Sequence, residues 1–147
     1  MHHEYKRVFA ALDGGKTQDL VAERAIQIAA ASHADLMLGH VVDSIPYEAA
    51  GTDFAALAEE MHTQLEESLG ALLEEARNNP DIPSVSVVVK AGRITETLSE
   101  QLIDPFNPDI VVCGERGYSN IKYVFVGSVS TYLIRNLLCD VLVVKAR

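Results

Sequence analysis

Five short apolar runs, separated by segments with helical periodicity, constrain the fold more than any other feature of this sequence. The segments between the runs place apolar residues three and four positions apart. A strand that is apolar at nearly every position is buried on both faces, which is typical of a parallel sheet covered by helices. The sequence therefore predicts an α/β domain with an open five-stranded parallel sheet and helices on both faces, with strands at 8–12, 36–43, 85–89, 110–113 and 141–144.

Four helices are expected between these strands. Thr17 is the expected N-cap of the first, which runs to Ser32. A loop over 44–52 leads to one long helix that Pro80 stops, and its glutamate-rich side is interpreted as a solvated face rather than an acidic interaction surface. The other two helices are expected at 93–103 and 128–138. The apolar face of the long helix consists of Phe54, Leu57, Met61, Leu65, Leu69, Leu72 and Ala76.

The length and the charge of the chain exclude several classes of protein. At 147 residues the chain has room for one domain, 1–147. Its 12 basic and 21 acidic side chains give a net charge of −9, which disfavours nucleic acid as a partner because such binding depends on basic patches. Small phosphorylated ligands stay compatible with this charge, since a few backbone amides can bind them.

Signals for a membrane or for secretion are not found in the sequence. The longest uncharged stretch, 123–134, is shorter than the roughly 20 residues that a transmembrane helix needs. The first seven residues lack the apolar run and the small-residue cleavage site of a secretory signal. We therefore expect a cytoplasmic protein without a membrane partner.

The loop after the fourth strand is the most informative stretch for function. Gly114 and Gly117 are followed after nine residues by Gly127, which opens a helix. The free amides of 128–130, the helix dipole and the hydroxyls of Ser128 and Ser130 would favour a phosphate. Such sheets bind ligands where the strand order reverses, so the site is expected at the ends of the first and fourth strands. The alternative is a glycine-containing loop before a serine-capped helix.

Four features together resemble the universal stress protein family over the whole chain. They are the Gly-x2-Gly-x9-Gly-Ser spacing, the Leu12-Asp13 end of the first strand, the His40-Val41-Val42-Asp43 end of the second, and the Cys139–Val144 terminus. The resemblance implies a Rossmann-like sheet of order 3-2-1-4-5. It also implies ATP binding, because the glycine motif belongs to the ATP-binding branch of that family.

The resemblance further implies a set of ligand contacts. Adenine would lie between Asp13 and the backbone of Val41, and a divalent cation, magnesium, would be bound through the phosphates. Arg116 stands where the family usually has histidine, and it would either contact a phosphate or point to solvent. Tyr118, Gly15 and Ile94 are further departures from the family pattern. The ribose and phosphates would lie against Gly114, Gly117, Gly127, Ser128, Val129 and Ser130.

Other chemistry receives less support from the sequence. Gly15-Lys16-Thr17 resembles the end of a P-loop, but position 10, where a P-loop needs glycine, is Ala10 inside a strand. Cys113 and Cys139 lack metal or redox spacing, and Cys113 is interpreted as a buried thiol. The histidines fall on separate elements, and for His40 a hydrogen-bonded core role is favoured over metal binding.

No convincing catalytic set converges on the predicted site, where Asp13 is the single acid. Asp13 would hold either a ribose hydroxyl or a metal-bound water. The favoured hypothesis is an ATP-binding stress-response or signalling module whose nucleotide occupancy alters dimer shape or partner choice. A slow metal-dependent ATP hydrolase and a nucleotide-free interaction module are the alternatives.

The final strand predicts a homodimer. The family resemblance places 141–145 at the edge of the sheet, and this apolar strand has no proline or inward charge to protect its backbone groups. Antiparallel pairing with a second copy would satisfy them in a two-fold interface. The alternative is that Lys145 and Arg147 protect the edge and keep the chain monomeric.

Overall fold

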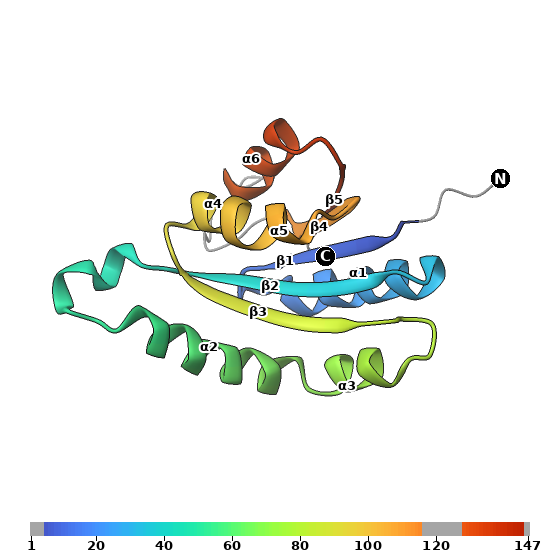
Figure 1. Ribbon diagram of the computed structural model, residues 1–147, viewed down its shortest axis with the longest axis horizontal. Coiled ribbons are helices and arrows are strands. Elements are labelled where there is room, and N and C mark those ends of the chain that lie inside the picture. The colour runs from blue at the N-terminus through green and yellow to red at the C-terminus, as the bar shows by residue number, and fades with distance from the viewer. Residues whose placement is uncertain (1–4, 116–127, 146–147) are drawn as a thin grey trace.

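The computed structural model describes residues 5–115 and 128–145, and it is built around one five-stranded sheet (Figure 1). The strand order is β3-β2-β1-β4-β5, and every neighbouring pair is parallel. The predicted fold class and strand order are therefore confirmed. The strands are β1 (Arg7–Leu12), β2 (Asp35–Asp43), β3 (Val85–Gly92), β4 (Ile110–Gly114) and β5 (Asp140–Val144).

Helices cover both faces of this sheet (Figure 1). One face carries α1 (Gln18–Ser32), α2 (Phe54–Leu69) and α3 (Ala71–Asn78). The opposite face carries a continuous helical segment, composed of α4 (Ile94–Thr97), the π-helix η2 (Leu98–Ile103) and α5 (Asp104–Phe106), together with α6 (Ser128–Asn136). A 3-10 helix, η1 (Ile45–Ala50), follows β2 within the predicted loop.

The side chains of β1 point alternately to the two faces of the sheet, which divides the core into two layers. Val8 and Ala10 pack toward α1, whereas Phe9 and Ala11 pack toward η2 and α6. Both layers are closed to solvent because a parallel strand in the middle of a sheet is covered on each side. A side chain at Gly39 of β2 would collide with the ring of Phe9, which explains a glycine inside a buried strand.

The predicted long helix is wrong as one element, because it breaks at Gly70. This residue has φ 50° and ψ −117°, and its amide still donates to the carbonyl of Glu66 at 3.1 Å. Beyond the break Leu73 enters the core, while Leu72 is only half-buried. A left-handed φ of this kind is adopted readily by glycine.

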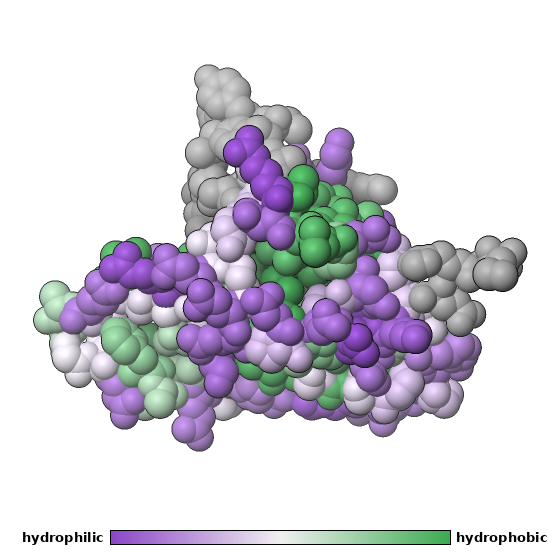
Figure 2. All heavy atoms as spheres, turned by 45° about the horizontal axis from the view of Figure 1, so that its top comes forward, coloured by the Kyte–Doolittle hydropathy of each residue, from purple (hydrophilic) through white to green (hydrophobic). Residues whose placement is uncertain are grey.

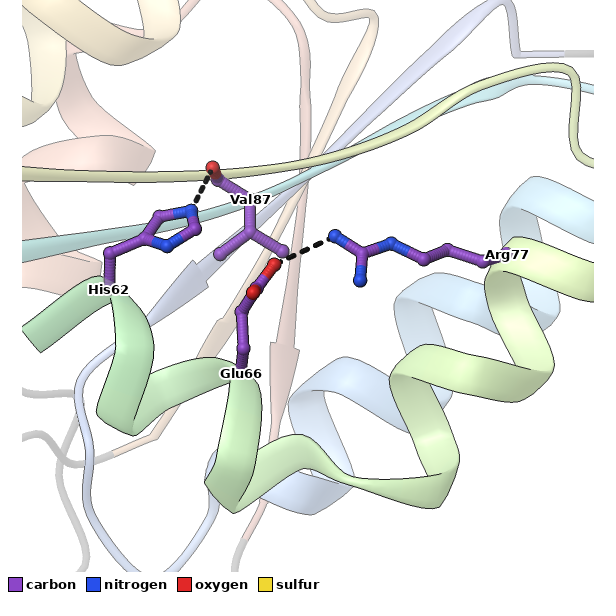
Figure 3. A network of polar contacts seen from close by, with 4 residues as sticks. All are labelled: His62, Glu66, Arg77 and Val87. Carbon is purple, nitrogen blue, oxygen red and sulfur yellow. Dashed lines mark hydrogen bonds and ion pairs between the residues drawn. The ribbon is translucent and has the colours of Figure 1, made fainter. Parts of the chain in front are cut away.

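Contacts around the break hold α2 and α3 on the sheet (Figure 3). Arg77 of α3 pairs with Glu66 of α2 at 2.7 Å, which joins the two helices across Gly70. The Nε2 of His62 lies 3.0 Å from the carbonyl oxygen of Val87, so the imidazole ties α2 to the edge strand β3. The glutamates of this helix pair are mostly exposed, in agreement with a solvated face.

Other element boundaries also differ from the prediction. The third predicted helix continues beyond Ile103 to Phe106, because the wider π turn accommodates Pro105 in the first turn of α5. It ends at Asn107, whose φ of 51° is left-handed. The strand β3 extends to Gly92, and α6 ends at Asn136.

The amino-terminal edge of the sheet is held by contacts between distant residues. The amides of Lys6 and Arg7 donate to the carboxylate of Asp109 at 2.9 and 2.8 Å. The hydroxyl of Tyr5 donates to Oδ2 of Asp140 at 2.7 Å. These bonds fix the start of β1 against the starts of β4 and β5. Within the described residues, no helix has the length and apolar character to cross a membrane.

Candidate functional site

The carboxyl ends of β1 and β4 lie side by side, because these strands pair in the middle of the sheet. The chain leaves β1 toward β2 on one side and adds β4 on the other, which makes this the place where the strand order reverses. The amino end of α6 meets β4 here through Ser130 and Gly114. The structure therefore brings Asp13, Gly114 and Ser130 together at the predicted edge.

Asp13 shapes the turn that follows β1. Its Oδ1 accepts a hydrogen bond from the amide of Gly15 at 2.7 Å, and Gly14 between them has a left-handed φ of 77°. The carboxylate is half-buried, and Oδ2 has no hydrogen bond in the described part of the chain. Asp13 thus offers one oxygen at the site while the other maintains the turn.

The end of β2 places Val41 in the core. This residue is 4% exposed and packs in the core layer of η2 and α6, so its side chain is not available to a ligand. His40 beside it places Nδ1 at 2.7 Å from the carbonyl oxygen of Leu12, which joins the ends of β1 and β2. The interpretation of His40 as a hydrogen-bonded histidine is confirmed, although the side chain is half-buried.

Gly114 ends β4, and the structure shows why a glycine stands there. A Cβ on Gly114 would lie 2.5 Å from Oγ1 of Thr17 and 3.6 Å from Val21 of α1. Its φ is not left-handed, so the need for glycine comes from close packing of α1 on β4. Thr17 therefore occupies the space beside Gly114, where the sequence had predicted a ligand.

Thr17 occupies the N-cap position of α1, but its side chain forms no capping hydrogen bond. The predicted N-cap position is therefore confirmed, but the hydroxyl does not cap the helix in the described part of the chain. The residue is 5% exposed, and its hydroxyl has no hydrogen-bond partner among the described residues. A buried hydroxyl without a partner is costly, and this one lies against the strand that leads into the glycine loop.

The start of α6 differs from its predicted role in one respect. Ser130 is 3% exposed, and its hydroxyl donates to the carbonyl of Gly114 instead of facing a phosphate. This bond anchors α6 to β4, so the hydroxyl of Ser130 is already engaged within the protein. Val129 is half-buried against the core, and Ser128 opens the helix as predicted.

Three predicted contacts lie outside the described residues. Arg116, Gly117 and Gly127 fall within 116–127, so their proposed contacts with phosphate stay predictions. Lys16 is exposed on the turn before α1. The chain continues from Gly114 into Glu115, whose amide donates to the carbonyl of Val144 at 2.9 Å and whose side chain is 6% exposed. Nothing in the sequence signals this burial.

Cys113 precedes Gly114 on β4, and its buried thiol is unreactive. Burial raises the pKa of its thiol, the hydrogen bond with Ser130 lowers it, and the negative charge of Asp13 raises it, with a net increase. The thiolate is therefore disfavoured at neutral pH, which agrees with the predicted buried thiol. Among the residues that the structure describes, no three His, Cys, Asp or Glu side chains are placed to hold a metal ion.

The fold belongs to the class of open parallel α/β domains. Members of this class that bind a ligand do so where the strand order reverses, which is where this chain places a helix start, a carboxylate and a glycine. Comparison with known proteins specifies the class further. The universal stress protein family model matches residues 4–145, and the chain belongs to that family. A Staphylococcus aureus (strain USA300) protein assigned to the universal stress proteins is 29% identical over 141 residues, covering 96% of this chain and 84% of the relative.

Solved structures share the fold. Universal stress protein UspA from Lactobacillus plantarum superposes with a TM-score of 0.81 at 19% identity, covering 97% of this chain and 99% of that one. A universal stress protein in complex with cAMP superposes with a TM-score of 0.62 at 25% identity, covering 97% and 98%. The first likeness concerns the fold alone, and the second adds that one relative binds a nucleotide.

Proposed function

We propose that this protein binds ATP at the carboxyl edge of its sheet and acts as a stress-response or signalling module. The observation that carries the proposal is the convergence of Asp13, Gly114 and the start of α6 at the switch point. Oδ2 of Asp13 and the peptide group of Val41 offer acceptor and donor groups for a nucleoside. The amides at the start of α6 suit an anionic phosphate.

The identity of the ligand is supported by the relatives. One structural neighbour was solved in complex with cAMP, an adenine nucleotide. We extend the adenine preference to this chain because its switch point offers the carboxylate of Asp13 and the backbone amides at the start of α6. The ATP-binding branch of the family, rather than the nucleotide-free one, is the assignment we propose.

The cation would be held mainly by the nucleotide. The described residues provide no cluster for a metal ion, so magnesium would be bound through the phosphates, where it neutralises their charge. Asp13 would then accept from a ribose hydroxyl or from a cation-bound water with the oxygen that the turn leaves unused.

We propose that occupancy, rather than turnover, carries the signal. The polar side chains described at the site are engaged in structural bonds: Asp13 in its turn and Ser130 on Gly114. The Cys113 thiol is held protonated by its burial. A slow metal-dependent hydrolysis through Asp13 is the alternative, and single-turnover measurement with radiolabelled ATP separates the two.

We also propose a homodimer formed through β5. This strand is at the edge of the sheet, and its valines 141 and 143 are only half-buried. Ile134 and Leu138 nearby are 50% and 106% exposed, and Figure 2 shows a hydrophobic surface on the side of the molecule that carries α6 and β5. An edge strand beside an exposed apolar surface favours pairing with another copy.

Titration calorimetry with ATP and magnesium tests the nucleotide proposal. We expect saturable binding by the wild-type chain, and Gly127→Val should abolish it because a branched side chain blocks the close approach of phosphate. Ser128→Ala should lose about 1 kcal/mol, roughly fivefold in affinity, as one hydroxyl contact. Absence of heat and of any thermal shift at millimolar ATP would contradict the proposal.

A further inference from the structure

The edge strand β3 presents a row of backbone groups on its outer side. The amide of Leu36 donates to the carbonyl of Ser84, and the amide of Ser44 donates to that of Gly92, each at 2.9 Å. The even-numbered residues of β3 therefore direct their backbone groups toward β2. Neighbouring residues of a strand alternate in this direction, so the odd-numbered residues direct theirs outward. These residues are Val85, Val87, Val89 and Ala91.

His62 of α2 covers one of these outward groups (Figure 3). Its Nε2 lies 3.0 Å from the carbonyl oxygen of Val87, which agrees with the outward direction of the odd-numbered residues. Toward the end of β3, no side chain or loop of the described residues bonds to the outward amides and carbonyls of Val89 and Ala91. An edge strand with free backbone groups is a template for another strand. The free part of β3 is therefore the stretch from Val89 to Ala91.

A groove lies beside this free stretch, between the start of α2 and the end of β3. Figure 1 shows α2 running alongside β3. The groove has a volume of about 440 Å³. Phe54, Ala55 and Ala58 line it on the helix side, and Val89 and Ala91 line it on the strand side. The residues with free backbone groups thus also border an apolar groove.

These two features together fit an extended peptide segment. A helix uses its amides and carbonyls internally, whereas an added strand supplies the hydrogen bonds that Val89 and Ala91 lack. Every second side chain of an added strand points to the same face of the sheet. Side chains two positions apart would therefore enter the groove, where main-chain pairing gives affinity and the groove gives selectivity.

The charge of α2 favours a basic segment. This helix has four glutamates and no lysine or arginine. Glu59 lines the groove, and none of the ion pairs in the described part of the chain includes it. Lys90 also lines the groove, but the chain as a whole carries a net charge of −9, which attracts a basic partner at longer range.

A second copy of this chain fits the groove less well than a basic peptide does. Two-fold pairing of β3 with itself would set two α2 helices on the same face of the joined sheet, each with its four glutamates. Like charges that meet across an interface oppose association. The charge complementarity therefore selects a different molecule as the occupant.

We propose that the groove between α2 and β3 is a docking site for a basic, extended peptide segment of a protein partner. The segment adds to β3 as a strand at Val89 and Ala91. It places an apolar side chain against Phe54 and Ala58, and a lysine or arginine two positions away beside Glu59. This site goes beyond nucleotide binding and depends on neither ATP nor the pairing of β5.

Fluorescence anisotropy with labelled hexapeptides tests the docking site. The basic probe is Thr-Leu-Thr-Lys-Thr-Lys, which places leucine and both lysines on one face of an added strand, and the acidic probe has glutamate at both lysine positions. We expect saturable binding of the basic probe and weaker binding of the acidic probe at low salt. Methylation of the backbone nitrogens of the basic probe removes its donors and should abolish binding.

Three variants locate the probe on the protein. Glu59→Gln should weaken binding about threefold, as expected for an exposed charge pair. Glu60→Gln is the matched control, because Glu60 is an exposed glutamate of α2 outside the groove, and it should leave binding unaltered. Ala91→Pro removes one outward amide without removing a hydrogen bond between β2 and β3, and should weaken binding about fivefold.

Hydrogen exchange measured by NMR on the wild-type chain avoids any change of fold by substitution. The amides of Val89 and Ala91 should exchange more slowly when the basic probe binds. Unaltered exchange, equal binding of the basic and acidic probes, or no binding at millimolar probe would overturn the proposal. Self-association of the wild-type chain that Ala91→Pro abolishes would show that a second copy occupies the groove, and would overturn it as well. ATP titration of the same variants reports separately on the nucleotide site.

Discussion

The amino ends of the strands, which form the amino edge of the sheet, and their carboxyl ends, which form the carboxyl edge, are held by different kinds of polar contact. At the amino edge, Tyr5, Lys6 and Arg7 bond to Asp109 and Asp140, which are more than 100 positions away in the sequence. At the carboxyl edge, Asp13 bonds to Gly15 only two positions on. The bonds at the amino edge therefore join segments more than 100 positions apart, whereas the side-chain bonds of Asp13, His40 and Ser130 at the carboxyl edge span 2, 28 and 16 positions.

This difference separates stability from ligand binding. Long-range bonds at the amino edge are lost only when the strands separate, so they contribute to the folded state. The carboxyl edge, in contrast, leaves an oxygen of Asp13 and the hydroxyl of Thr17 without a hydrogen bond in the described part of the chain. We therefore expect mutations at the amino edge to change stability alone, and mutations at the carboxyl edge to change ligand binding as well.

The largest loss of stability is expected for Asp109→Ala. The substitution leaves the amides of Lys6 and Arg7 without their carboxylate acceptor, and two hydrogen bonds to a charged group are together worth about 3 kcal/mol. Urea denaturation should show this loss, while ATP affinity should stay at the wild-type value. Asp109→Asn keeps an acceptor and should lose less. A fall in ATP affinity would contradict the separation of the two edges.

The stability of the wild-type protein at acid pH should depend on the ionisation of Asp109. Burial opposes ionisation, but the amides of Lys6, Arg7 and Asp109 together with the charge of Arg7 outweigh it and hold the pKa of this carboxyl below its ordinary value of 3.8. The stabilisation is therefore complete above pH 3.8 and is lost as the pH falls through the lower pKa of the folded state. The D109A variant should lack this component of the pH profile.

The second largest effect is expected for Gly114→Ala. The new Cβ would lie 2.5 Å from Oγ1 of Thr17, and overpacking of this kind costs about 2 kcal/mol. Because β4 leads into the glycine loop, ATP affinity should fall together with the melting temperature. Thr17→Ala in the same chain should restore much of the stability, whereas Thr17→Val, which keeps a methyl group in place of the hydroxyl, should not. Equal stability of G114A and wild type would show that the close contact is relieved elsewhere.

The strand pattern could be predicted because burial on both faces requires an apolar residue at almost every position of a central parallel strand. The break at Gly70 could not, since the apolar periodicity continues on both sides of it and the left-handed φ is visible only in the packed helix pair. The third helix was predicted to end at residue 103, but the π turn over 98–103 lets it continue through Pro105 to Phe106.

The candidate site was predictable to a similar degree. The rule that ligands bind beyond the carboxyl ends of strands at a switch point indicated the ends of the first and fourth strands, which include Asp13 and Gly114, whereas Val41 was named through the family resemblance alone. The burial of Thr17 against Gly114 depends on how closely α1 packs on β4, which no local pattern records. The hydroxyl of Ser130 was expected to donate to a phosphate because a hydroxyl at a helix start can do so, but here it donates to the carbonyl of Gly114.

The smallest effect is expected for the hydroxyl of Tyr5, at the amino edge. Its hydrogen bond to Asp140, followed by burial and by the charges of Asp140 and Asp109, raises the pKa of Tyr5 from 10.0 to about 12. The protonated phenol is the form that donates, so its stabilisation is fully present below pH 10 and is lost as the pH rises from 10.0 through about 12. Since the group is largely exposed, solvent reduces its contribution to less than about 1 kcal/mol.

Tyr5→Phe isolates this contribution, because phenylalanine keeps the ring and removes only the hydroxyl. The difference in free energy of unfolding between wild type and Y5F should be constant from pH 7 to pH 9 and should narrow above pH 10, where the folded protein retains a proton that the unfolded chain releases. Other lysines and tyrosines titrate in both proteins and cancel in the difference. A difference that does not narrow in this window would mean that the Tyr5–Asp140 bond does not fix β1 to β5, and the amino edge would then depend on Asp109 alone.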